Sequence, residues 1–125
     1  MSEDRRERGE ARRRQVLGDD HVDRSQADPA GLDAKFTDLT TATAWGTVWA
    51  SDAITLRERS MVTLGILAAT GAWEEFELHL KATANTGASP ADIVEVIQHV
   101  GAYAGIPRAN SAIKIAKRVL ADIAP

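Results

Sequence analysis

Two of the chain's histidines have neighbours at helical spacing that could serve proton transfer. The first, His79, lies in the stretch Trp73-Glu-Glu-Phe-Glu-Leu-His-Leu80, and Glu75 precedes it by one helical turn. On a helix this carboxylate could hydrogen-bond the imidazole and fix its tautomer. An oriented imidazole can then donate or accept a proton. A packed histidine bonded to a local carboxylate has the same spacing, so both interpretations of His79 stay open.

The second histidine, His99, lies between Glu95 and Tyr103 at intervals of four residues. Residues at this spacing form one stripe of a helix. The imidazole of His99 could therefore be a second acid–base group. A polar stripe of this kind is also typical of a solvated helix face or a subunit contact, and Tyr103 could simply pack at its edge.

Charged side chains gather where the most apolar segment of the chain begins. Arg57, Glu58 and Arg59 open this segment, and guanidinium groups there could bind a substrate carboxylate through paired hydrogen bonds. For the arginines the alternative is surface ion pairing. For Glu58 the alternative is a helix cap, because Thr55-Leu-Arg-Glu58 has the spacing of a capping box.

The N-terminal half contributes one histidine and two tryptophans. His21 lies in a polar segment, and Trp45 and Trp49 are four residues apart on a predicted helix. Two large aromatic side chains one turn apart could form the apolar wall of a pocket or an interface. An ordinary core pair has the same spacing, so this alternative also stays open.

The composition excludes several classes of chemistry. The 125 residues include no cysteine, which rules out disulfides, thiol nucleophiles and thiolate zinc sites. Three histidines are few for a metal site, and glycine-rich phosphate or dinucleotide loops are absent, so we expect neither metal nor cofactor. The net charge of −3 argues against a nucleic-acid partner. With no apolar run of the roughly 20 residues that a membrane span needs, and no recognisable secretory signal, we expect a cytoplasmic protein without a membrane partner.

The sequence pattern predicts an all-α fold, a compact bundle of five to six short helices. Residues 1–17 form a charge-dense N-terminal arm of mixed sign, expected to be a solvated helix. Residues 18–31 are polar and turn-rich, as in a loop. We expect a single helical domain over 18–125, with core helices at about 33–49, 56–70, 73–84, 90–104 and from 107 onward.

The segment Met61–Thr70 is apolar nearly all round. A helix without a polar face must be covered on every side, and a bundle of this size offers few helices to cover it. We therefore expect a homo-oligomer, in which contacts between subunits supply the missing layer.

Five stretches of the chain together resemble a known family. They are Arg13–Arg24 (with Val-Leu-Gly-Asp-Asp-His-Val), Ala44-Trp-Gly-Thr-Val-Trp49, Leu56–Leu64, Glu77-Leu-His-Leu80 and Tyr103-Ala-Gly-Ile-Pro-Arg-Ala-Asn110. The first two are the most specific, and the likeness spans residues 13–120. On these residues the chain resembles the 4-carboxymuconolactone decarboxylases, which belong to a superfamily of alkylhydroperoxidase-D-like helical proteins.

The resemblance implies a reaction and an assembly. The reaction is the cofactor-free decarboxylation of 4-carboxymuconolactone, a dianionic lactone, to 3-oxoadipate enol-lactone and CO2 in the protocatechuate branch of aromatic catabolism (the β-ketoadipate pathway). The assembly is a homo-oligomer, a trimer or a ring-like homohexamer. The related peroxidases use a Cys-x-x-Cys pair whose positions fall at Ala72 and Glu75 here, so peroxidase chemistry is excluded. A glutamate of those peroxidases falls at Ser60.

Within this resemblance we assign roles to the candidate residues. His79 is expected to donate the proton and to be held by Glu75 or Glu77. A substrate carboxylate is expected to bind Arg59, with Arg57. The other expected site residues are Glu58 as a catalytic group and Trp45, Trp49 and His21 as substrate-binding groups. The alternatives are a related decarboxylase or cyclase acting on another lactone or carbonyl compound in a natural-product pathway, and a non-catalytic oligomeric binding protein of the same fold.

Overall fold

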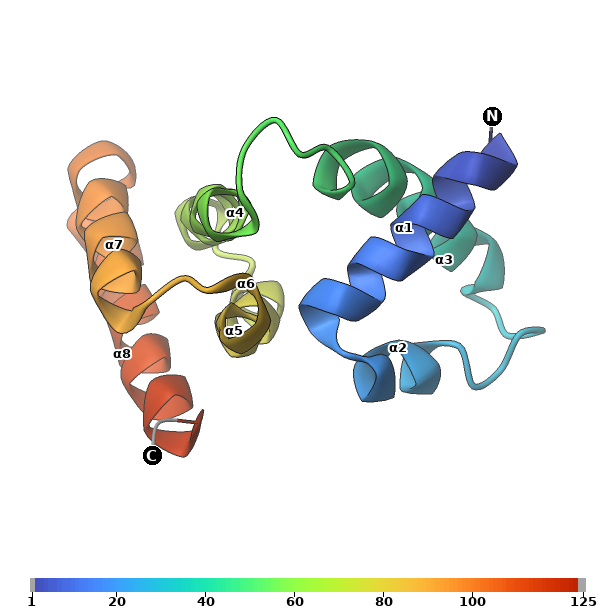
Figure 1. Cartoon of the computed structure of the whole chain (residues 1–125). Helices are drawn as coiled ribbons and strands as arrows, with labels where there is room; N and C mark the ends of the chain where they lie inside the picture. Colours follow the sequence, from blue (N-terminus) through green and yellow to red (C-terminus); the bar gives the residue numbers. More distant parts are fainter. Residues whose placement is uncertain (1, 124–125) are drawn as a thin grey trace. The chain divides into compact units, whose positions relative to one another are not determined.

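A computed structural model describes residues 2–123, and all regular structure within them is helical (Figure 1). This confirms the all-helical prediction, with more and shorter elements than the five to six expected. None of these helices is long and apolar enough to cross a membrane. The elements are α1 (Ser2–Leu17), α2 (Asp19–Ser25), α3 (Ala34–Thr40), the π-helix η1 (Thr41–Trp49), α4 (Leu56–Thr70), α5 (Trp73–Lys81), α6 (Thr83–Thr86), α7 (Pro90–Ala104) and α8 (Ile106–Ile123).

The chain divides into two compact units, Met1–Ile54 and Thr55–Pro125. The first unit comprises α1, α2, α3 and η1, and the second comprises α4 to α8. The charged segment 1–17 thus belongs to a larger unit that ends just before the capping box of α4. We describe each unit by itself.

Helix α1 is not the solvated arm that its charges suggest. It packs directly on η1, at a crossing where both helices carry a glycine. A Cβ added to Gly9 would lie 2.8 Å from the backbone nitrogen of Gly46 and still closer to the carbonyl oxygen of Thr41. A Cβ on Gly46 would in turn meet the backbone of Arg5. The missing side chains allow the two backbones to touch, and this contact replaces the apolar stripe that α1 lacks.

The segment predicted as a loop at 18–31 begins with a short helix, so that part of the prediction is wrong. Gly18 adopts φ 91°, a left-handed conformation suited to glycine, and turns the chain from α1 into α2. Val22 of α2 is fully buried. Arg14 ties the two helices together through ion pairs to Asp19 at 3.0 Å and Asp23 at 2.9 Å.

The helix predicted at 33–49 changes type midway. It starts as α3 and continues as the nine-residue π-helix η1, the wider helical form that is rare and often found at functional sites. Thr41, at the junction, is buried and its hydroxyl donates to the carbonyl of Thr37 at 2.7 Å. In η1 the hydroxyl of Thr47 reaches the carbonyl of Ala42, five residues back, at 3.2 Å.

The second unit follows its sequence signals closely. Thr55 and Glu58 form the predicted capping box of α4, and Gly71 ends that helix at φ 74°. Ser89 and Asp92 form a second capping box at the start of α7, with Pro90 in its first turn. The segment predicted as one helix at 73–84 is split into α5 and the single turn α6.

The core of the second unit lies between α4, α5, α7 and α8, which pack against one another. Phe76 and Leu80 of α5 are fully buried, and Trp73 meets Phe76 edge-on at a ring distance of 5.8 Å. Helix α4 buries only one face in this core. On its other face Val62 and Ile66 are 55% and 58% exposed, so within one chain this apolar helix is not covered on every side. The buried residues that form this core cluster are Leu64, Ala68, Phe76, Leu80, Ile93, Ile97, Val100, Ala112, Ala116 and Val119.

Candidate active site

His79 lies in the last turn of α5 and is 7% exposed. It is buried because it follows Phe76 by one helical turn and so flanks the inward face that Phe76 and Leu80 form. The other buried polar residues among those described are one serine and three threonines, which carry hydroxyl groups. Among the residues whose burial is described, His79 is therefore the single buried side chain that carries an imidazole, the group suited to proton transfer.

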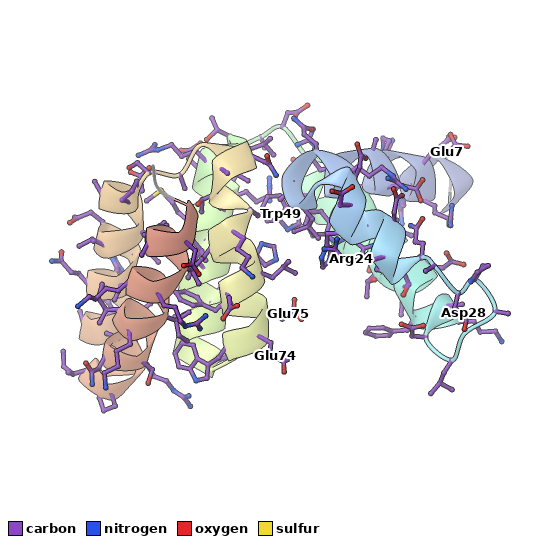
Figure 2. All side chains as sticks on the ribbon, turned by 90° about the horizontal axis from the view of Figure 1, so that it is seen from below. Glu7, Arg24, Asp28, Trp49, Glu74 and Glu75 are labelled. Atoms are coloured by element: carbon purple, nitrogen blue, oxygen red, sulfur yellow. The ribbon has the colours of Figure 1, made fainter. Side chains whose placement is uncertain are left out.

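The carboxylates of α5 differ in what they contact. Glu77 binds Arg118 at 2.7 Å and Lys81 at 3.4 Å, and the hydrogen bond from Arg118 is the main cause that lowers the pKa of Glu77. Glu77 is thus engaged with α8. Glu74 and Glu75 are exposed and lie next to each other on α5 (Figure 2). Of the two carboxylates that sequence spacing offered to His79, Glu75 is the better candidate.

A buried hydroxyl on α4 is a further polar group of the second unit. In the sequence this residue, Ser60, stands out only as the position of a glutamate in related peroxidases. Ser60 is fully buried, and its Oγ has no hydrogen-bond partner among the described residues. Leaving such a group unpaired costs about 1–3 kcal/mol, so a bound polar molecule could satisfy it. The signal was present in the sequence, because Ser60, Leu64 and Ala68 follow at intervals of four and share the buried face of α4.

Arg57 forms an ion pair with Asp92 within the second unit. Its Nε and Nη2 donate to the two carboxylate oxygens of Asp92 at 2.7 and 2.6 Å, and the backbone nitrogen of Ser89 donates to Asp92 at 2.9 Å. The hydrogen bonds from Arg57 are the main reason that the pKa of Asp92 lies far below its usual value. A substrate carboxylate at Arg57 would therefore compete with a bidentate pair already formed.

Glu58 is the acid of the capping box, the alternative that its spacing offered. Its carboxylate accepts a hydrogen bond from the backbone nitrogen of Thr55 at 2.8 Å, and this bond is the main cause that lowers its pKa. Arg59 follows in the first turn of α4, is partly buried and directly precedes the buried Ser60. Of the three charged residues that open α4, Arg59 is the one beside a buried polar group.

The remaining predicted site residues belong to the first unit. Trp45 and Trp49 stack with ring centroids 5.0 Å apart and are 8% and 6% exposed. Arg12 donates to the carbonyl of Trp49 at 2.9 Å and to Asp52 at 3.1 Å, which holds the end of η1. His21 is partly buried on α2. The burial of the tryptophan pair agrees with a packing role within this unit, and its substrate-binding role stays a prediction.

A hollow of about 600 Å³ lies in the second unit between α4 and α7. His99, predicted as an alternative acid–base group, lines it and stacks on Tyr103 at a ring distance of 5.0 Å. His79 is not among its lining residues, and no lysine or arginine of the described chain lines it. An apolar hollow without a cation is a poor site for a doubly charged anion. In residues 2–123, no three histidine or acidic side chains gather as a metal site would require.

Comparison with known proteins relates this chain to a family of decarboxylases. Residues 34–118 match the carboxymuconolactone decarboxylase family. A 4-carboxymuconolactone decarboxylase from Acinetobacter baylyi is 35% identical over 121 residues, which cover 97% of this chain and 90% of that protein. A nitrosuccinic acid decarboxylase from Metarhizium robertsii is 30% identical over 111 residues, covering 89% of this chain and 78% of that protein. The chain therefore belongs to the carboxymuconolactone decarboxylase family.

Proposed function

We propose that this protein is a carboxy-lyase that converts 4-carboxymuconolactone into 3-oxoadipate enol-lactone and CO2. The observation that carries the proposal is the burial of His79, which gives the second unit a proton-transfer group shielded from water. The family match and the 35% identity to a 4-carboxymuconolactone decarboxylase support the choice of substrate.

The reaction needs little from the protein besides binding and one proton. When the carbon–carbon bond to the departing carboxylate breaks, its electron pair passes into the conjugated unsaturated lactone and forms a dienolate. A proton then adds to carbon, and the second carboxylate remains on the product. The protein accelerates these steps by holding the dianion, removing water from the departing carboxylate and supplying the proton.

Each of these tasks has a candidate residue in the second unit. The imidazole of His79 donates the proton, and Glu75, one turn earlier on α5, orients the ring. Arg59 binds a carboxylate of the substrate, and the hydroxyl of Ser60, buried beside it, supplies a hydrogen bond. We assign Glu58 to helix capping rather than to proton donation, because a lowered pKa keeps its carboxylate ionised at neutral pH.

A second candidate substrate is a nitro-substituted dicarboxylate, favoured by the 30% identity to a nitrosuccinic acid decarboxylase. The two reactions share their chemistry. In each, a dianion loses a carboxylate from a carbon that is attached to an electron-withdrawing group or conjugated with one through a double bond, and that group holds the electron pair until a proton adds to carbon. The same imidazole and the same guanidinium could serve both, so the two substrates must be compared directly.

The test is an assay of the purified full chain with each substrate, following the ultraviolet absorbance of the conjugated lactone and the release of CO2. We expect turnover of the lactone, and a loss of kcat of about 100- to 10,000-fold in His79→Gln. Near-normal turnover by His79→Gln would contradict the assignment of the proton donor. Binding of the lactone without CO2 release would instead support a non-catalytic protein of this fold.

Glu74 and Glu75 provide a matched pair for the orienting role. Both are exposed neighbours on α5 (Figure 2), and only Glu75 lies four residues before His79. We expect Glu75→Gln to lower kcat and to change the pH profile of kcat, with Glu74→Gln indistinguishable from the wild type. Equal effects of the two substitutions would mean that α5 acts only through its overall charge.

A further inference from the structure

Arg13 of α1 carries a buried guanidinium nitrogen that no group of the described chain satisfies. Its Nη1 is shielded from solvent and has no hydrogen-bond partner among the described residues. Burial is the main cause that lowers the pKa of Arg13, and the nearby charge of Glu10 raises it by less. A guanidinium stays protonated in proteins. This nitrogen therefore brings positive charge and an unused donor to a buried position, which is costly unless a partner arrives.

The position of Arg13 on α1 directs it toward η1. Gly9, Arg13 and Val16 follow one another at intervals of four and three residues, so they share one face of the helix. Gly9 marks the close crossing with η1, and Val16 is fully buried. Arg13 thus lies on the face of α1 that packs on η1, the helix whose buried residues include Trp45 and Trp49.

The charges around Arg13 are already engaged with other groups. Glu10, one turn earlier on α1, accepts a hydrogen bond from Gln26 at 3.0 Å through Oε1, and its Oε2 lies 3.8 Å from Nε of Arg14. Arg12 and Arg14, which flank Arg13 in the sequence, each have a carboxylate partner, at 3.1 and 3.0 Å. The arginines on either side are therefore paired, whereas Nη1 of Arg13 keeps an unused donor.

We propose that Arg13 is a substrate-binding residue that takes one carboxylate of the dianionic substrate. This inference rests on the proposed function, in which both carboxylates of the lactone need a cation. One of them is assigned to Arg59, whereas Arg57 already binds both carboxylate oxygens of Asp92. The second carboxylate requires another cation, and Arg13 offers one whose unused N–H can donate to it.

The setting of Arg13 favours an organic carboxylate over an inorganic anion. A guanidinium fits carboxylate and phosphate alike, so charge alone does not decide between them. In a buried setting, however, each anion oxygen that stays unpaired is costly. A carboxylate brings two oxygens on a carbon skeleton that can pack against apolar groups, whereas phosphate brings four oxygens and no apolar part.

The test measures binding and turnover separately on the full chain. Binding of 4-carboxymuconolactone is followed by calorimetry in His79→Gln, with and without Arg13→Gln, because slow turnover in this background allows equilibrium. Steady-state kinetics are measured in the single variants. We expect Arg13→Gln to raise Kd and KM by about 10- to 100-fold and to change kcat by less than about threefold, since the carboxylate is held equally before and during the reaction.

Two further variants separate substrate binding from charge and from folding. Arg8→Gln removes the same charge from an exposed position of the same helix and is expected to leave Kd and KM unchanged. Arg13→Lys keeps the charge without the guanidinium fork and is expected to bind with an intermediate Kd. Without ligand, the urea midpoint of Arg13→Gln is expected to equal or exceed that of the wild type, because the substitution removes a buried charge whose Nη1 has no partner.

The outcomes distinguish this inference from the proposed reaction. Wild-type Kd and KM in Arg13→Gln would overturn the role of Arg13 and leave the reaction intact. A wild type that binds the lactone through Arg13 without CO2 release would contradict the reaction and support the role of Arg13. Absence of binding in every protein would overturn both. Inorganic phosphate that displaces the lactone with equal affinity, only when Arg13 is present, would overturn the assignment to a carboxylate.

Discussion

The glycine crossing between α1 and η1 leads to a prediction whose sign is opposite to that of the usual helix propensity. Gly9 lies inside α1, where replacing glycine by alanine normally stabilises a helix by about 1 kcal/mol. In this protein the added Cβ would lie 2.8 Å from the backbone nitrogen of Gly46 and closer still to the carbonyl of Thr41. Because backbone atoms cannot rotate away, α1 must move off η1 for Gly9→Ala to fold.

The size of the effect follows from these distances. Ordinary contacts begin at 3.4 Å. The contact with Gly46 alone would require the backbones to separate by about 0.6 Å, and the closer contact with the carbonyl oxygen of Thr41 requires more. Overpacking of this kind costs about 1–3 kcal/mol, and the upper end applies where the blocking atoms are backbone. After about 1 kcal/mol of helix propensity is subtracted, Gly9→Ala is expected to lower the free energy of unfolding by about 2 kcal/mol.

Gly65 of α4 provides the matched control. It also lies inside a helix, but a Cβ there would lie 3.7 Å from Cγ1 of Val96, an ordinary contact. Gly65→Ala is therefore expected to raise the free energy of unfolding by about 0.5–1 kcal/mol. The two substitutions, identical in chemistry, should differ by about 3 kcal/mol and in sign.

The assay is urea unfolding at one fixed protein concentration, followed by tryptophan fluorescence and by circular dichroism. Thermal unfolding adds a measure of cooperativity. At about 2.1 cal/mol/K per residue, a loss of 2 kcal/mol lowers Tm by about 18 °C if Met1–Ile54 unfolds alone, and by about 8 °C if all 125 residues unfold together. A Gly9→Ala protein as stable as the wild type, or more stable, would refute the close crossing.

Three further predictions concern the ends of helices in the second unit. The pKa of Asp92 is lowered mainly by Arg57. The contribution of Asp92 to stability is therefore present above the unfolded-state pKa of about 3.9 and is lost as the pH falls below that value. Urea midpoints of the wild type should drop more steeply below about pH 4 than those of Asp92→Asn. Thr55→Ala removes a capping hydroxyl and should lower the free energy of unfolding by about 1 kcal/mol, whereas no change would mean that the α4 cap is dispensable. Gly71→Ala forces a side chain to φ 74° against the guanidinium of Arg108, and should destabilise by about 1 kcal/mol or more; an unchanged Tm would contradict that backbone conformation.

Local sequence signals predicted the second unit well because its helices carry their own start and stop signals. The capping box at Thr55 forms as predicted, and the helices expected at 56–70 and 90–104 have those bounds in the structure. The capping box at Ser89 and the glycine at 71 likewise act within four residues of sequence. The first unit was predicted less well. The crossing at Gly9 joins residues more than thirty positions apart, and nothing within α1 itself indicates that its glycine faces another backbone.

The candidate site shows the same difference between features set by nearby residues and features set by distant contacts. Helical spacing offered a packed position as one of two interpretations of His79 and a cap as the alternative to the catalytic role expected for Glu58. The structure buries His79 and forms the cap, and both features depend on neighbours within one turn. The partner of Arg57 could not be predicted, since Asp92 lies on another helix and its position depends on how α4 and α7 pack. The sequence shows a guanidinium at Arg57, but only the fold shows that this guanidinium is paired with the carboxylate of Asp92.

The ion pair between Arg57 and Asp92 also gives the α4–α7 pair an electrical direction. Both residues lie in the first turns of their helices, so the pair joins two helix N-termini, each of which carries about half a positive charge from aligned peptide dipoles. Glu58 and Asp92 place two carboxylates at this end, where they offset the accumulated charge. At the opposite end, near Thr70 and Ala104, neither last turn carries a charged residue, but the guanidinium of Arg108 lies beside Gly71, where α4 ends. The charged side chains of the α4–α7 pair are thus ordered against the helix dipoles, with carboxylates at the N-terminal end and a guanidinium where α4 ends, so that they weaken the field of the dipoles along the pair.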